Sequence, residues 1–152
     1  MKKIILIVLV AAIGSIQNSF AQNTSLLPLY FDMKDALVAD NSALAATKAG
    51  EFVKEFTTVD FSKLSQNDHD ALLKGATHIS ESKDIKHQRE HFAAFSNSMI
   101  ALAKVTKLSP QPVYQLYCPM KKSSWLSNEK SVKNPYYGKA MLTCGSVTKT
   151  LN

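Results

Sequence analysis

The stretch from Ile85 to about Lys107 constrains the fold of this chain most, because it carries a long and regular helical pattern. Its large apolar residues are spaced by three, four or seven positions: Ile85, Phe92, Phe95, Met99 and Leu102. Such spacing places them along one face of an α-helix, as at the seam between packed helices. We therefore predict a long amphipathic helix that forms part of a bundle.

Three shorter segments before it show apolar residues at the same helical spacing. They run from about Leu29 to Ala39, from Ala43 to Phe56 and from Asp68 to Ser80. The joints Asp40–Ser42 and Ser80–Asp84 consist of polar residues that suit helix ends and N-caps. Because short joints favour antiparallel neighbours, the sequence predicts a mainly α protein with an antiparallel four-helix bundle.

The pattern changes after the segment Ser109-Pro110-Gln111-Pro112, which ends the helical part. Val113–Cys118 is rich in residues that favour strands, and Met141–Leu151 is a second extended run. A polar loop between them closes with the turn residues Asn134–Gly138. We predict a small C-terminal β-hairpin, or an irregular strand-loop-strand appendix, packed on the bundle.

The N-terminal residues 1–21 have the composition of a signal peptide. Two lysines come first, Ile4–Ile16 is apolar or small throughout, and a polar stretch ends at Ala21. The apolar run is shorter than the ~20 residues that span a bilayer. We predict cleavage after Ala21 and a single domain over residues 22–152. It is expected to be soluble, periplasmic or otherwise exported, and without a membrane span once the signal is removed.

Charge and missing motifs argue against two classes of function. The chain has 18 Lys and Arg residues against 12 Asp and Glu residues, and this positive excess is spread along its length. Nucleic-acid binders gather their basic residues on one face, so no nucleic-acid partner is expected. The sequence also contains no phosphate loop, nucleophile elbow or HExxH pair, and we expect a protein that is not an enzyme.

His87 and His91 are the first candidate metal ligands. They stand four residues apart in the long helix, where Cβ atoms lie about 5–6 Å from each other. Two imidazoles on successive turns can bind one metal ion. The alternative is a pair of half-buried histidines with ordinary hydrogen-bond partners.

Cysteine and methionine side chains form the second candidate group. In Cys118-Pro119-Met120 an extended backbone points both sulfurs the same way, and Met141 and Cys144 repeat the two residue types. If the two strands pair antiparallel, the four sulfurs meet, and sulfur ligands favour Cu(I) and similar soft ions. The alternative is a Cys118–Cys144 disulfide, stabilising by about 3–4 kcal/mol, with the methionines as core filler.

Several motifs, taken in order, resemble the family called "domain of unknown function 3347". They cover nearly all of the chain after the signal: Tyr30–Asp40, Asp84–Phe92, Tyr117–Met120, Trp125–Ser127, Asn134–Gly138 and Met141–Gly145. The resemblance implies an exported protein of a kind found mostly in Bacteroidetes. Relatives occur alone or joined to the periplasmic adaptor subunits of heavy-metal efflux pumps. A copper ion or another heavy-metal ion, and a heavy-metal efflux assembly as partner, are therefore expected.

The motif match carries over six candidate metal ligands: His87, His91, Cys118, Met120, Met141 and Cys144. Lys121–Ser124 is shorter and less rich in Gly and Asn than the same loop in many relatives, which bears on access to the site. The first hypothesis is a non-catalytic periplasmic domain that binds copper or another soft ion through His and Cys/Met side chains. The alternative is a protein-interaction module with a structural disulfide and no metal. The first hypothesis requires imidazoles and sulfurs to lie close together.

Overall fold

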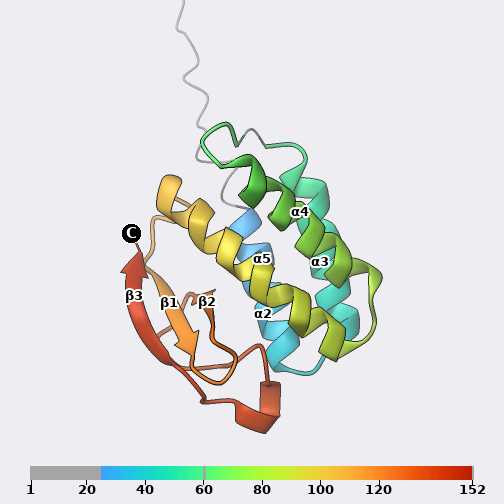
Figure 1. Cartoon of the computed structure of the whole chain (residues 1–152), viewed down its shortest axis with the longest axis vertical. Helices are drawn as coiled ribbons and strands as arrows, with labels where there is room; N and C mark the ends of the chain where they lie inside the picture. Colours follow the sequence, from blue (N-terminus) through green and yellow to red (C-terminus); the bar gives the residue numbers. More distant parts are fainter. Residues whose placement is uncertain (1–24, 60, 152) are drawn as a thin grey trace, which may run out of the picture.

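The structure is a computed structural model that describes residues 25–59 and 61–151. The predicted signal peptide lies outside the described residues. These residues form four α-helices and a small C-terminal sheet (Figure 1). The helices are α2 (Leu26–Val38), α3 (Ser42–Phe56), α4 (Gln66–Glu81) and α5 (Ile85–Val105). The predicted mainly α class with a helical bundle is confirmed.

Helices α3, α4 and α5 begin where the sequence supplies capping side chains. Asn41 accepts a hydrogen bond from the Leu44 N–H before α3, and Ser65 and Asp84 cap α4 and α5 in the same way. Helix α2 begins three residues before the predicted start at Leu29. Pro28 permits this earlier start, because a proline needs no hydrogen-bonding N–H in the first turn of a helix.

The helices pack as successive neighbours, α2 on α3, α3 on α4 and α4 on α5. The apolar stripe of α5 is the centre of the core, and Phe92, Phe95, Met99 and Leu102 are all fully buried. The Phe95 ring meets Phe52 edge to face, with centroids 4.9 Å apart, and also contacts Tyr30. The predicted bundle seam therefore does face the other helices.

The sheet has three antiparallel strands, β1 (Val113–Cys118), β2 (Ser123–Ser127) and β3 (Ser146–Leu151), in the order β2-β1-β3. Figure 1 shows it on one side of α5, with β2 nearest the helix and β3 outermost. The bounds of β1 and its antiparallel pairing with the last strand are as predicted. The last strand begins later than Met141, because Gly138–Met141 forms a short 3-10 helix, η1.

Strand β2 was not predicted, and its burial explains why. Trp125, Leu126 and Ser127 are buried in succession, so the strand lacks the alternation that marks a half-exposed strand. Its two faces are both covered. The Trp125 ring packs against Tyr136 of the C-terminal segment, while the Leu126 N–H donates a hydrogen bond to the hydroxyl of Tyr30 in α2.

Gln88 ties the α4–α5 joint to the rest of the bundle. Its amide nitrogen lies within hydrogen-bond distance of the backbone carbonyls of Ser42, Ile79 and Ser82. The side chain is fully buried. A buried carbonyl that loses its partner costs about 1–3 kcal/mol. Gln88 therefore fixes the position of α5 relative to α4 and to the start of α3.

We predict that Gln88→Met lowers the free energy of unfolding by about 2–3 kcal/mol, since no other donor replaces the amide. Urea denaturation measures the change. Gln66→Met is the matched control, because Gln66 lies exposed on the first turn of α4, where its amide donates a hydrogen bond to the exposed Asp70, and its effect should stay within about 0.5 kcal/mol. Equal losses in the two variants would contradict the role assigned to Gln88.

Candidate metal centre

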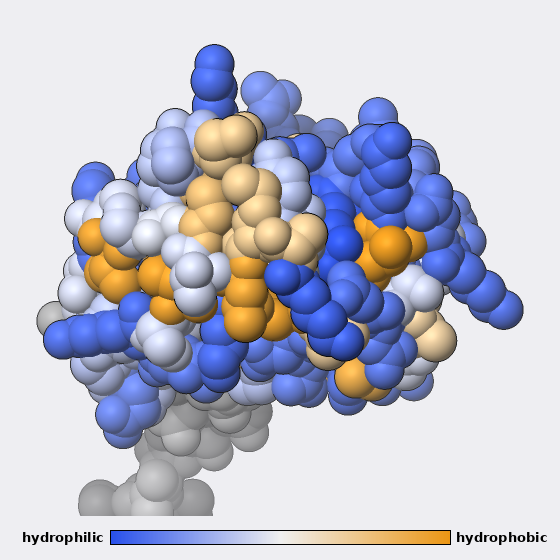
Figure 2. Space-filling view, turned by 90° about the horizontal axis from the view of Figure 1, so that it is seen from below, coloured by the Kyte–Doolittle hydropathy of each residue, from blue (hydrophilic) through white to orange (hydrophobic). Residues whose placement is uncertain are grey.

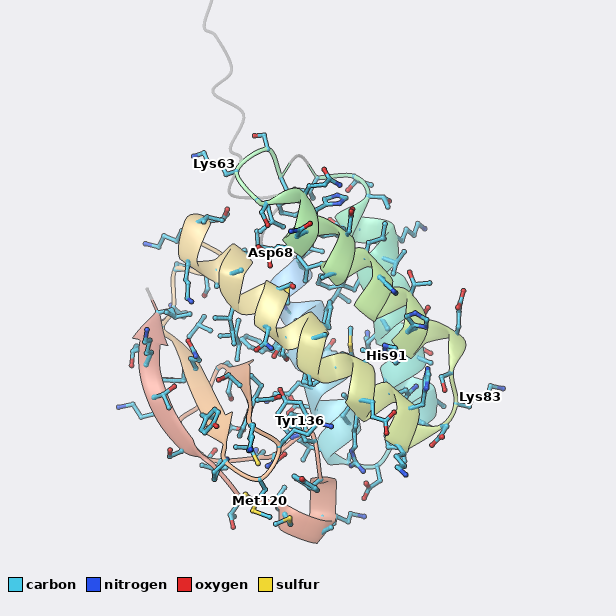
Figure 3. All side chains as sticks on the ribbon, in the orientation of Figure 1. Lys63, Asp68, Lys83, His91, Met120 and Tyr136 are labelled. Atoms are coloured by element: carbon cyan, nitrogen blue, oxygen red, sulfur yellow. The ribbon has the colours of Figure 1, made fainter. Side chains whose placement is uncertain are left out.

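Three imidazoles meet where α4 turns into α5. His78 lies near the end of α4, and His87 and His91 lie in the first two turns of α5. The joint between the helices has only three residues, so the end of α4 lies beside the start of α5. His91 points toward α4 in Figure 3, away from the sheet.

The ligand nitrogens of these three residues all lie within 4.8 Å of one another. His91 is the central member: its ring centroid is 4.2 Å from that of His78 and 4.4 Å from that of His87. The His78 and His87 rings are 6.2 Å apart. With metal–nitrogen bonds of about 2.0–2.1 Å, two ligand nitrogens can be at most roughly 4.2 Å apart, so small side-chain rotations suffice to bind one ion.

The three rings lie at the edge of the fold, where they contact each other more than the rest of the protein. Each side chain is half-buried, and none has a hydrogen-bond partner within the described part of the chain. The rings contact each other instead. Their nitrogens therefore remain available to an ion.

The environment of His91 favours its neutral form. Partial burial lowers the pKa of His91, and repulsion from charge on His78 and His87 lowers it further. A neutral imidazole is the form that binds metal. His78 and His87 also line a shallow surface hollow with Glu81 and Asp84, whose carboxylates add negative charge near an incoming cation. Three nitrogen ligands leave a fourth position for water or an exchanging ligand.

Sequence reasoning identified His87 and His91 but missed His78. Their pairing was visible from the four-residue spacing along one helix. His78 comes from another helix, and only the short polar joint Ser82–Asp84 indicated that the two helix ends are close. Residues at similar distances on either side of such a joint face each other, which was the signal available for His78. The fourth histidine, His69, lies at the other end of α4 beside the Phe56 ring.

The predicted sulfur residues gather at the end of the sheet. Cys118 ends β1 and Cys144 precedes β3, and their sulfurs are 3.4 Å apart and not bonded to each other. Met120 lies in the β1–β2 turn and is 63% exposed, and Met141 ends η1. The predicted closeness of the two cysteines is confirmed. The structure has two thiols where the alternative hypothesis expected a disulfide.

The structure does not bring the imidazoles and the sulfurs together. Arg89 lies two residues from both His87 and His91, hence about 200° around α5 and on its opposite face. From that face it donates hydrogen bonds to the carbonyls of Leu37 and Pro135 and packs against Gly138. The C-terminal segment thus meets the side of α5 that faces away from the histidines. The sequence-based expectation that His and sulfur ligands bind one ion together is therefore wrong. The imidazoles form one group and the sulfurs form another.

Comparison with known proteins gives one match. The family model described as "Protein of unknown function (DUF3347)" matches residues 26–111, which is more than half of the chain. The matched part includes all four helices and the three histidines, and it ends just before β1. No curated protein and no solved structure matches the chain at a significant level. No helix in the described ranges is long and apolar enough to cross a membrane.

Proposed function

We propose that this chain, which belongs to the DUF3347 family of proteins of unknown function, binds a copper ion or another late transition-metal ion through His78, His87 and His91. The observation that carries the proposal is the distance between their ligand nitrogens, all within 4.8 Å of one another. His87 and His91 come from successive turns of α5, and His78 comes from α4. An ion at this place would join the two helices.

The ligand set favours copper. Imidazole nitrogen is a good ligand for Zn²⁺, Cu²⁺ and Ni²⁺, and a poor one for Mg²⁺ and Ca²⁺, which prefer oxygen. At a given nitrogen site Cu²⁺ binds more tightly than the other divalent ions of the first transition row. With three imidazoles and no thiolate in this group, Cu²⁺ is the expected preferred ion and Zn²⁺ the main competitor.

The proposed role is binding and transfer rather than catalysis. All three imidazoles are half-buried, and those of His78 and His87 line a shallow hollow from which an ion can reach them without a large movement of the helices. This suits a domain that captures an ion and passes it on. The composition of residues 1–21 and the family resemblance support an exported, periplasmic location, and the resemblance supports a heavy-metal efflux assembly as the receiving partner.

Titration of the purified protein with Cu²⁺ and Zn²⁺ tests this proposal. We expect one ion per chain at this site and tighter binding of Cu²⁺ than of Zn²⁺. At a free ion concentration of 100 times Kd the folded state gains about 2.7 kcal/mol. For a domain of this size that corresponds to a rise in Tm of roughly 5–10 °C, measurable by calorimetry.

His69→Ala is the matched control, because it removes a histidine outside the cluster. It should leave both affinity and the shift in Tm unchanged. A protein whose Tm responds to neither ion, or a His69→Ala variant that loses the response, would contradict the proposal.

A further inference from the structure

We propose that Cys118 and Cys144, assisted by Met120 and Met141, form a second and separate site that binds a soft monovalent cation of the Cu(I) type. This goes beyond the proposed function, because it uses other residues on the opposite side of α5. The sulfurs of the two cysteines are 3.4 Å apart. Two thiolates at this separation can hold one soft ion between them after a small outward rotation.

The sheet brings the two cysteines together. Strands β1 and β3 pair antiparallel with Tyr117 opposite Ser146, so the residue after Tyr117 lies beside the segment that leads into β3. Cys118 is buried and Cys144 is half-buried. Cys118 is thus held inside the fold, and Cys144 lies on the side of the pair that borders solvent.

Hydrogen bonds and close packing fix the two turns that carry the thiols. The Lys121 N–H donates to the Cys118 sulfur at 3.4 Å, and the Asn134 amide donates to the Cys144 carbonyl at 2.7 Å. Gly145 has a φ of +144°, and a Cβ there would lie 2.8 Å from the Trp125 ring. Glycine therefore lets the backbone after Cys144 lie directly on that ring. The position of the thiol is set by the fold.

Binding of a soft ion at the two cysteines involves no change of oxidation state. On binding Cu(I), both thiols release their protons to solvent and each sulfur forms a bond to the ion, with no oxidant or reductant.

The thioethers distinguish an ion site from a structural cysteine pair. Met120 is 63% exposed, so it does not fill the core. Figure 3 shows sulfur atoms gathered around the labelled Met120 at the end of the molecule that holds η1. Met141 stands one turn before Cys144, whose N–H donates to the Met141 carbonyl. A structural disulfide does not require thioether side chains beside it, whereas Cu(I) accepts both thiolate and thioether sulfur as ligands.

Exposed apolar side chains come from the segments on either side of the cysteines, and such a border suits a weakly hydrated ion. Four exposed large apolar side chains come from the segments next to the cysteines: Tyr117, Met120, Leu142 and Val147. Figure 2, which views the molecule from this end, shows an apolar area bounded by hydrophilic side chains. Hard ions such as Mg²⁺ and Ca²⁺, which require oxygen ligands, find none of their preferred partners among the thiols and thioethers.

Competition for Cu(I) tests the proposal. The reduced protein is titrated without oxygen against a chromophoric Cu(I) chelator, and X-ray absorption identifies the ligand atoms. We expect one Cu(I) per chain with sulfur as its main ligand. Cys144→Ser, at the half-buried position, should lower Cu(I) affinity by at least about 100-fold, more than the 10–100-fold typical of losing a supporting residue. Met120→Leu should weaken binding by roughly 10-fold and leave the fold intact, because Met120 is exposed.

His91→Ala serves as the control that separates this site from the imidazole site, and it should bind Cu(I) as the parent does. If Cys144→Ser retains the parent affinity for Cu(I), or if the reduced protein takes up no Cu(I) and only forms a disulfide when oxidised, the second site is refuted. Loss of Cu(I) binding in His91→Ala would also overturn it. None of these outcomes depends on whether Cu²⁺ binds to the histidines.

Discussion

Replacing His91 with alanine is expected to lower the affinity for Cu²⁺ by at least about 100-fold, since it removes a direct ligand rather than a supporting residue. His91 is the one ring that lies within 4.5 Å, centroid to centroid, of both other members. Without it the remaining rings, those of His78 and His87, have centroids 6.2 Å apart. Two imidazoles alone retain only part of the binding free energy. Competition titration against a Cu²⁺ chelator measures the loss.

The fold should survive this substitution, because His91 is half-buried and has no hydrogen-bond partner within the described ranges. Circular dichroism of the metal-free variant should match that of the parent. The matched control is again His69→Ala. A His91→Ala variant that binds Cu²⁺ as tightly as the parent would remove the three-imidazole centre from consideration.

Replacing Phe95 with alanine is expected to lower the free energy of unfolding by about 3–5 kcal/mol, the largest effect on stability that we predict. Phe95 is fully buried where α5 crosses α4. A Cβ added to Gly75 of α4 would lie only 2.9 Å from the Cβ of Phe95. Its ring also contacts those of Tyr30 and Phe52. Removal leaves a cavity between the rings of Tyr30 and Phe52 and the backbone of α4 at Gly75, which cannot all move inward to fill it.

Urea or guanidinium denaturation measures this change. Leu44→Ala is the control, because Leu44 lies on α3 with 42% of its surface exposed and should change the stability by less than about 1 kcal/mol. If the two variants unfold at the same denaturant concentration, the aromatic cluster around α5 does not form the core described above.

The helices could be predicted because their signal is local. The spacing of Phe92, Phe95 and Met99 fixes both the helical period and the face that is buried. Strand β2 could not be predicted in this way. Burial on both faces gave Trp125 and Leu126 no alternation, and the covering elements come from distant parts of the sequence. A pattern of residues shows a buried face only when the opposite face is exposed.

The candidate sites show the same division between local and long-range information. The His87–His91 pair and the closeness of Cys118 to Cys144 follow from the period of a helix and from antiparallel pairing. Which side of α5 meets the C-terminal segment does not follow from either. That choice depends on Arg89, whose hydrogen bonds to the Leu37 and Pro135 carbonyls join α2 and the C-terminal segment to the face opposite the histidines.

The most direct test of the three-imidazole centre is X-ray diffraction at the copper absorption edge from crystals of the protein grown with Cu²⁺. We predict one anomalous peak at the α4–α5 joint, bonded to nitrogens of His78, His87 and His91. A strong peak elsewhere on the molecule, with these three rings still in contact with one another and free of metal, would contradict the account.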